Sequence, residues 1–186
     1  MSAQSDPRRP GGKKDDYLFK NVVMRAGKKL FERLFNRPVN RIDEVRVDEE
    51  QTLLSGRPDL VLDLYTDDEA LLVQFEHQTA DDPELGEKLA RHFVAILKRF
   101  GKAPTQVVAF MDDSASKYAS GVKFLTPTGT GMTLTFWAFN FSQIPAEWFL
   151  DDEDPFGLML AMFCDRSRIG ETTWLETVGR AVPKMS

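Results

Sequence analysis

Near the start of the chain, hydrophobic residues recur at intervals of three and four positions, the spacing of an amphipathic helix. We predict this helix from Asp16 to just before Pro38, because a residue that precedes proline avoids helical geometry. Residues 1–14 combine Pro, Gly, Ser and basic residues without apolar periodicity, so we expect a disordered tail there. The apolar positions of the helix are Leu18, Phe19, Val22, Val23, Ala26, Leu30, Phe31, Leu34 and Phe35.

After this helix the pattern changes to short extended segments, some alternating and some continuously apolar. A second amphipathic segment interrupts them and is followed by Gly101, a typical helix end. The order of helix, three strands, helix and strand predicts an α/β domain with a mixed sheet. Strands are predicted over 42–50, 58–65, 70–78, 106–111, 122–126 and 132–139, and helices over 84–100, 154–163 and 171–180.

Composition narrows the class of protein. A length of 186 residues corresponds to about one domain. Fourteen Phe and three Trp are enough to build a core. No apolar run is long enough to span a membrane, and no apolar stretch follows the basic N-terminus, so we expect a cytoplasmic protein without a secretory signal. A single cysteine, Cys164, and two histidines argue against a disulfide framework and against a zinc site.

The charge balance excludes one mode of nucleic-acid binding. The chain has 24 Lys and Arg against 29 Asp and Glu, a formal net charge of −5, and its pI is near 5.1. Proteins that hold nucleic acid by bulk electrostatics usually carry a basic face and a high pI. We therefore do not expect stable coating of DNA, whereas an enzyme that contacts DNA transiently and uses metal ions remains allowed.

The turn at Asp67 and Asp68 predicts where two carboxylates meet. If these residues are central in a hairpin, Asp59 lies opposite Glu76, with the two Cβ atoms roughly 4.5–5.5 Å apart. Two carboxylates at that distance repel each other unless a cation lies between them, and Mg²⁺ prefers oxygen ligands. Gln78 points the same way as Glu76, because side chains alternate along a strand.

The same residues have a simpler interpretation. Asp59 can be a polar residue at the start of a strand, and Glu76 a solvated residue near the end of another. A slip of one residue in the strand pairing would turn every side chain to the other face. Spacing alone therefore leaves the metal site and the solvated strand ends both open.

Four ordered elements resemble the PD-(D/E)XK phosphodiesterase superfamily, and within it the Rpn family of recombination-promoting nucleases and putative transposases. The elements are Asp16-Tyr17-Leu18-Phe19-Lys20, Arg57-Pro58-Asp59-Leu60-Val61, Phe75-Glu76-His77-Gln78-Thr79, and Arg91 in the following helix. The resemblance covers residues 15 to 112 and implies a restriction-endonuclease-like core, which we place over 15–140. Residues 141–186 would form a helical extension packed on it.

The resemblance also implies a site and a function. Asp59 and Glu76 would ligate Mg²⁺ or Mn²⁺ together with the backbone carbonyl of His77. Gln78 would stand where most of the superfamily has lysine, and it would orient the attacking water. Lys20 and Arg91 would contact the scissile phosphate, although a solvated helix face also explains each of them. The activity implied is metal-dependent hydrolysis of DNA, linked to recombination or transposition, and a homodimer would suit double-strand cutting.

A second hypothesis comes from a different class. The chain can be a catalytically weak or inactive nuclease-fold module that acts in nucleic-acid binding or protein assembly. The acidic pI, the missing lysine and the lack of an obvious basic DNA cradle motivate it. Under both hypotheses we expect the His77 ring in the core on the opposite face, His92 in a structural role and Lys88 on an ordinary charged surface.

Overall fold

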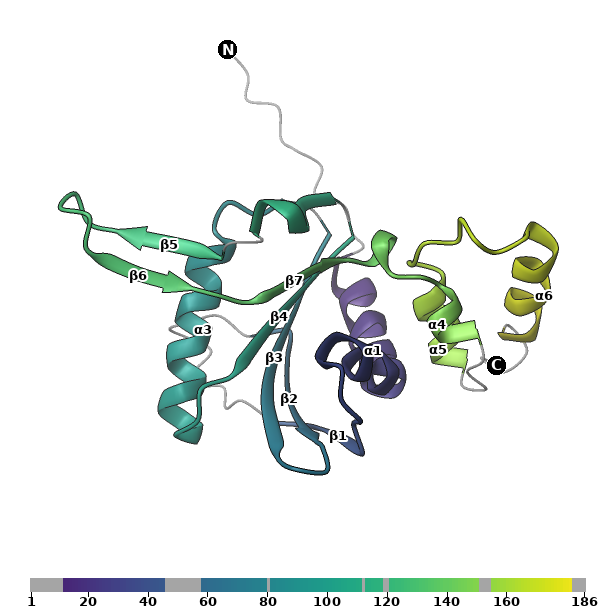
Figure 1. The fold of residues 1–186 in the computed structure, drawn as a ribbon, viewed down its shortest axis with the longest axis horizontal. Helices are drawn as coiled ribbons and strands as arrows, with labels where there is room; N and C mark the ends of the chain where they lie inside the picture. The colour runs from purple at the N-terminus through teal and green to yellow at the C-terminus, as the bar shows by residue number, and fades with distance from the viewer. Residues whose placement is uncertain are drawn as a thin grey trace, which may run out of the picture.

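The chain forms a mixed α/β fold in which helices flank a five-stranded sheet on both faces (Figure 1). The computed structural model describes residues 12–45, 58–79, 81–111, 113–118, 121–150 and 155–181. The elements in order are α1 (Gly12–Phe35), β1 (Arg41–Glu44), β2 (Leu60–Tyr65), β3 (Ala70–Gln78), α3 (Leu85–Phe100), β4 (Thr105–Phe110), η1 (Asp113–Tyr118), β5 (Val122–Leu125), β6 (Gly131–Leu134), β7 (Trp137–Asn140), η2 (Phe141–Gln143), α4 (Glu147–Leu150), α5 (Pro155–Ala161) and α6 (Glu171–Ala181).

The sheet has the strand order β1-β2-β3-β4-β7. Its first three strands form an antiparallel meander. Helix α3 then carries the chain back so that β4 runs parallel to β3, and β7 pairs in parallel with β4. Parallel neighbours need such a crossover connection. The predicted α/β class with a mixed sheet is confirmed.

The hairpin register is the one that the turn predicts. The β2–β3 ladder runs from the Tyr65–Ala70 pair to the Leu60–Phe75 pair. Continued by one residue, the same register would set Asp59, which precedes β2, opposite Glu76. Leu60, Leu62, Leu64 and Phe75 belong to the core cluster under α1. Val61 and Leu72, on the other face, pack with Ile96 of α3. Glu76 therefore lies on the sheet face that α3 covers, whereas Asp59 lies just before β2, near Lys20 of α1.

The two faces of the sheet have separate apolar clusters. On one face, α1 contributes Val23, Leu30 and Phe31 to a cluster that also contains Phe149 and Leu160 from the C-terminal helices. On the other face, α3 contributes Leu85 and Leu89. Gly101 ends α3 as predicted, with a φ of 64° and its N–H donating to the carbonyl of Leu97.

Several predicted boundaries were wrong or lie outside the described residues. Helix α1 begins at Gly12, inside the stretch expected to be a tail, and residues 1–11 are not described. Of the strand predicted over 42–50, only the part up to Glu44 is seen, and 46–50 are not described. Residues 132–139 are not one strand: β6 pairs with β5, and the chain then enters the main sheet as β7.

Within the described ranges, no helix combines enough length with enough apolar character to cross a membrane.

Candidate functional site

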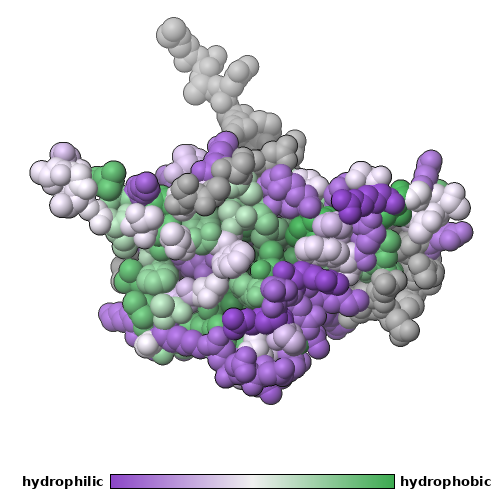
Figure 2. Space-filling model, viewed as in Figure 1, coloured by the Kyte–Doolittle hydropathy of each residue, from purple (hydrophilic) through white to green (hydrophobic). Residues whose placement is uncertain are grey.

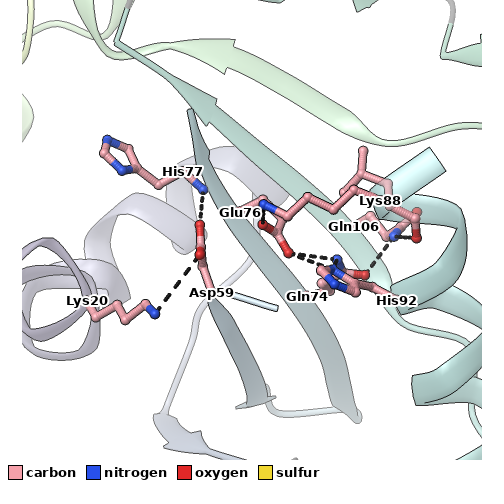
Figure 3. A network of polar contacts seen from close by, with 9 residues as sticks. Lys20, Asp59, Gln74, Glu76, His77, Lys88, His92 and Gln106 are labelled. Carbon is pink, nitrogen blue, oxygen red and sulfur yellow. Dashed lines mark hydrogen bonds and ion pairs between the residues drawn. The ribbon is translucent and has the colours of Figure 1, made fainter. Parts of the chain in front are cut away.

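Asp59 precedes β2 and reaches across to β3. Its Oδ2 atom accepts a hydrogen bond of 2.8 Å from the backbone N–H of His77. The ammonium of Lys20, which comes from α1, lies 4.0 Å from Oδ1 (Figure 3). Asp59 therefore lies at the meeting point of α1, β2 and β3, and 19% of its side chain is exposed.

The environment of Asp59 disfavours its charge. Burial raises the pKa of this carboxyl group to about 6, and the nearby charge of Glu76 adds to the increase. The hydrogen bond from His77 and the charges of Lys88 and Lys20 act in the opposite direction but do not cancel it. Asp59 thus carries an incompletely compensated negative charge, a property common among residues that bind cations.

Glu76 is fully buried, and each of its oxygens faces a nitrogen donor. The ammonium of Lys88 lies 2.8 Å from Oε2. This contact is an ion pair, since Oε2 accepts no hydrogen bond of regular geometry from the described residues. The Nδ1 atom of His92 lies 2.9 Å from Oε1, and Gln74 donates to the same oxygen at 3.1 Å. The same Nδ1 atom lies 3.1 Å from the Gln74 amide nitrogen, so Glu76, His92 and Gln74 form one compact polar cluster.

These partners keep Glu76 ionised. Burial alone would raise its pKa, but the hydrogen bond from His92 and the charge of Lys88 outweigh burial, and the pKa lies below its ordinary value. The pKa of Lys88 is likewise raised, because its attraction to Glu76 exceeds the effect of burial. Asp59 and Glu76 thus differ: Glu76 has a cation at 2.8 Å, whereas the nearest cation to Asp59, Lys20, lies at 4.0 Å.

A buried network of side-chain hydrogen bonds fixes the orientation of Glu76. The Gln106 amide donates to Gln74 Oε1 at 2.6 Å and to the Leu89 carbonyl at 2.9 Å. The Gln74 amide in turn donates a hydrogen bond to Glu76 (Figure 3). Gln74, His92 and Gln106 are all at most 3% exposed. Such a network in a low-dielectric interior holds its members in one geometry, and here it leaves Glu76 little freedom to rotate.

The structure separates the other predicted site residues. Gln78 is buried near the end of β3, on the side of the sheet that Glu76 faces. The His77 ring lies on the opposite face, stacked on Phe19 with centroids 3.9 Å apart, as expected. Arg91 is not in contact with Asp59 or Glu76; its guanidinium is half exposed and lies 4.0 Å from Glu87 on the surface of α3.

Two residues close to Glu76 were missed from the sequence. Lys88 was expected on an ordinary charged surface, and that prediction was wrong: its ammonium contacts a buried carboxylate. His92 was expected only to be structural, and its contact with Glu76 was not foreseen. A signal was present, since residues 85, 88, 89, 92 and 96 share one helix face and the other three are buried and apolar. A lysine and a histidine at core positions indicate a buried polar partner.

The site offers oxygen ligands to a hard cation. Among the described residues, no group of three or more His, Cys, Asp and Glu side chains is arranged to hold a metal. The available donors are the two carboxylates and backbone carbonyls, which suit Mg²⁺ or Mn²⁺. The Lys88 ammonium already stands beside Oε2, so positive charge is accommodated there. Because 29% of the Lys88 side chain is exposed, its flexible stem can give way to a divalent ion.

Comparisons with known proteins assign no family. The sequence matches no family model, and neither curated proteins nor solved structures give a match. The site must therefore be interpreted from its own chemistry.

Proposed function

We propose that the protein is a metal-dependent endonuclease that hydrolyses DNA phosphodiester bonds. In this proposal the α/β fold is a restriction-endonuclease-like core, and the protein is a distant member of the PD-(D/E)XK superfamily, close to its Rpn family. A role in recombination or transposition and a cytoplasmic location belong to the same proposal. The order of helix, antiparallel hairpin, crossover helix and parallel strand supports it.

One observation carries the proposal. Beyond the last pair of the hairpin ladder, Leu60–Phe75, the Asp59 side chain accepts a hydrogen bond from the backbone N–H of His77, directly beside Glu76. Burial and the charge of Glu76 raise the pKa of Asp59 to about 6. A divalent cation between the two groups would remove that penalty, which explains why a fold would keep two carboxylates together at a partly buried position.

In this proposal each site residue has a separate role in binding the ion, the water or the phosphate. Mg²⁺ or Mn²⁺, when bound, would polarise the scissile phosphate and lower the pKa of an attacking water. Asp59 and Glu76 would hold the ion, with the backbone carbonyl of His77 as a further ligand. Lys20, beside Asp59, would contact the phosphate, and Gln78 would orient the water. Arg91 lies further along α3 and would contact DNA outside the reacting group.

Lys88 can supply the positive charge that Gln78 lacks. Glutamine at position 78 cannot supply the positive charge that lysine gives in most of the superfamily. Lys88 brings an ammonium to Glu76 from α3 instead. We propose that Lys88 provides the electrostatic stabilisation of the developing phosphate charge, so that the glutamine does not by itself imply lost activity.

A second function is favoured by the same contacts. Glu76 is fully buried, forms an ion pair with Lys88 and contacts His92 through its other oxygen, so the cluster also has the character of a closed structural ion pair. If Lys88 never leaves, the protein is a nuclease-fold module that binds nucleic acid or assembles with protein partners without cleaving. This second function predicts no divalent-ion binding at Asp59.

Nicking of supercoiled plasmid with Mg²⁺ or Mn²⁺ tests the proposal. Wild-type protein should convert the plasmid to open circles, and Asp59→Asn and Glu76→Gln should each abolish the conversion. Asp63→Asn is a matched control, because Asp63 lies in β2 four residues after Asp59 and is paired with Leu72 and Asp43, away from Glu76. Equal nicking by wild type and Asp59→Asn would assign the cleavage to another site or a contaminant. No nicking with either ion, together with no Mn²⁺ binding by calorimetry, would favour the second function.

A further inference from the structure

A hollow opens at the edge of the sheet, between the middle of α3 and the start of β7. Its volume is about 630 Å³, within the roughly 300–1,000 Å³ of small-molecule sites. Green, apolar atoms border this part of the surface in Figure 2. The residues that line it include Phe93 of α3, Thr105 and Gln106 of β4, and Phe136 just before β7. Asp59 and Glu76 are not among its described lining residues, so the hollow is separate from the candidate metal site.

The stagger of two strands leaves main-chain groups open in the hollow. β4 begins to pair with β3 at Thr105, but it pairs with β7 only from Val107, which lies opposite Trp137. Within the described strands, Thr105 and Gln106 therefore have no neighbour on the β7 side. Since successive residues of a strand direct their main-chain groups to alternate sides, one of the two turns an N–H donor and a C=O acceptor toward the hollow.

Gln106 adds a buried acceptor to the hollow. Its amide nitrogen uses both hydrogens, donating to Gln74 Oε1 at 2.6 Å and to the Leu89 carbonyl at 2.9 Å. These two bonds fix the orientation of the amide, because a flip would place its oxygen against two other acceptors. The Oε1 atom accepts no hydrogen bond from the described residues, although Gln106 is only 3% exposed. An N–H donor bound in the hollow would recover the free energy that this unpaired oxygen costs.

The walls of the hollow are aromatic and uncharged. Phe93 and Phe136 are both half-buried and pack against the cluster that contains Leu85 and Leu89. Among the described residues that line the hollow, none is ionisable. A charged ligand would therefore find no counter-ion there, whereas a flat aromatic ring can stack against either phenylalanine. The lining thus favours an uncharged, planar ligand that carries an N–H donor.

We infer that this hollow binds the base of a free nucleoside. A nucleobase is flat and uncharged, and its edge carries N–H donors next to acceptor atoms. Such an edge can donate to Gln106 Oε1 and pair with the open main-chain groups of β4, while the ring stacks on Phe93 or Phe136. No lysine or arginine is among the described lining residues to hold a phosphate, which favours the nucleoside over the nucleotide.

Isothermal titration calorimetry with adenosine and with uridine tests the site, using the full wild-type chain in EDTA. At least one of the two nucleosides should bind. N6,N6-dimethyladenosine and N3-methyluridine keep the ring but lack the N–H donor of the base. The analogue of the nucleoside that binds should therefore bind about tenfold more weakly. Because no divalent ion is present, the result is independent of whether the protein cleaves DNA.

Phenylalanine variants test the location of the site. Phe93→Ala and Phe136→Ala each remove one wall, from two different elements, and each should weaken nucleoside binding about tenfold. Phe124→Ala is the matched control, because Phe124 packs on the same cluster from β5 but is not among the described residues that line the hollow. Circular dichroism verifies that the variants are folded, and if one of the two wall variants does not fold, the other decides.

Weaker binding in the wall variants, with unchanged binding in Phe124→Ala, supports the inference. The absence of heat with both nucleosides at millimolar concentration overturns it, and so does unchanged affinity in the wall variants. Equal affinity for the methylated analogue would contradict the contact with Gln106 and overturn the assignment to a nucleobase edge. Binding of a single-stranded oligodeoxynucleotide without binding of either nucleoside also overturns it, because the base would then come from a nucleic acid.

Discussion

At the scale of single residues, two neighbouring carboxylates have opposite electrostatic environments. Glu76 is buried but matched by Lys88 and His92, so its pKa is lowered. Asp59 is less buried but poorly matched, so its pKa is raised to about 6. Holding ionised Asp59 at this buried position beside Glu76 lowers the stability of the folded protein. A cation bound between the two carboxylates would recover that free energy. Functional sites commonly hold such destabilised groups, and removing them often stabilises the protein.

Asp59→Asn should therefore stabilise the metal-free protein at neutral pH. The folded state binds the Asp59 proton more tightly than the unfolded state, in which the pKa of this group is near its ordinary value of 3.8. Stability of the wild type should thus fall as the pH rises from about 4 to about 6, whereas that of the variant should not. Above pH 6 the variant should be more stable by up to about 3 kcal/mol.

Urea unfolding in EDTA across this pH range measures the difference. Asn retains an oxygen that can accept the His77 N–H, so the comparison isolates the charge. A variant that is less stable than the wild type at pH 7 would contradict the raised pKa of Asp59.

Lys88→Met should leave Glu76 buried without its ammonium. Breaking a buried ion pair on one side typically costs about 3–5 kcal/mol, and we expect a loss near the lower end because Lys88 is partly exposed. Mn²⁺ should recover part of the loss, so that it raises the melting temperature of the variant more than that of the wild type. Differential scanning fluorimetry with and without Mn²⁺ measures both effects.

Lys98→Met is the control for this experiment, since Lys98 is exposed on the last turn of the same helix. Its stability and its response to Mn²⁺ should equal those of the wild type. The same Mn²⁺ response in Lys88→Met and wild type would show that no ion binds beside Glu76.

At the scale of elements, the hydrophobic pattern of the sequence predicted features set by nearby residues, such as the hairpin register. It missed features that depend on residues distant in the sequence. The composition of residues 66–69 was enough to fix the β2–β3 register, because a tight turn determines every pair that follows it. The division of residues 132–139 into β6 and β7 could not be foreseen, because pairing with β4 decides it. Similarly, Lys88 shares a helix face with Leu85 and Leu89, but only the packing of α3 on β3 shows that Glu76 is its partner.

The contact between Gly86 of α3 and Val122 of β5 gives a prediction at the scale of elements. Gly86→Ala should destabilise the fold by about 1–3 kcal/mol, because the new methyl group would meet Val122, whose branched side chain has few rotamers. Helix propensity acts in the opposite direction, since alanine is favoured over glycine by about 1 kcal/mol in a helix. Val122→Ala should relieve the clash, so the double variant should be more stable than the two single losses predict. A double-mutant cycle measured by urea unfolding gives this coupling, and additive losses would contradict the contact.

At the scale of the whole molecule, the segment after the sheet shares the core of the first helix. Phe149, Leu160 and Cys164 belong to the same buried cluster as Leu30 and Phe31 of α1. This arrangement makes residues 141–150 and 155–164 part of the unit that supports Lys20 and Asp59. The sequence predicted a helical extension packed on the core, but its short apolar runs do not reveal that α1 is the helix it contacts.

Cys164 reports on this unit directly. Its thiol is buried, donates to the Leu160 carbonyl, and has a pKa raised to about 12 by burial. At pH 8 the folded protein should therefore react with a thiol reagent such as DTNB only when the core opens. The labelling rate should follow the free energy of global unfolding as urea is added. Labelling much faster than global unfolding allows would show that the C-terminal segment opens independently of α1.

The central claim is that Asp59 and Glu76 share a divalent cation. A crystal soaked in Mn²⁺, with anomalous scattering recorded at a wavelength where manganese is visible, tests it most directly. We predict an anomalous peak within bonding distance of a carboxylate oxygen of both residues, with the Lys88 ammonium displaced from Oε2, and no peak in Asp59→Asn. A wild-type crystal without a peak there, in which Lys88 still contacts Glu76, would contradict the claim.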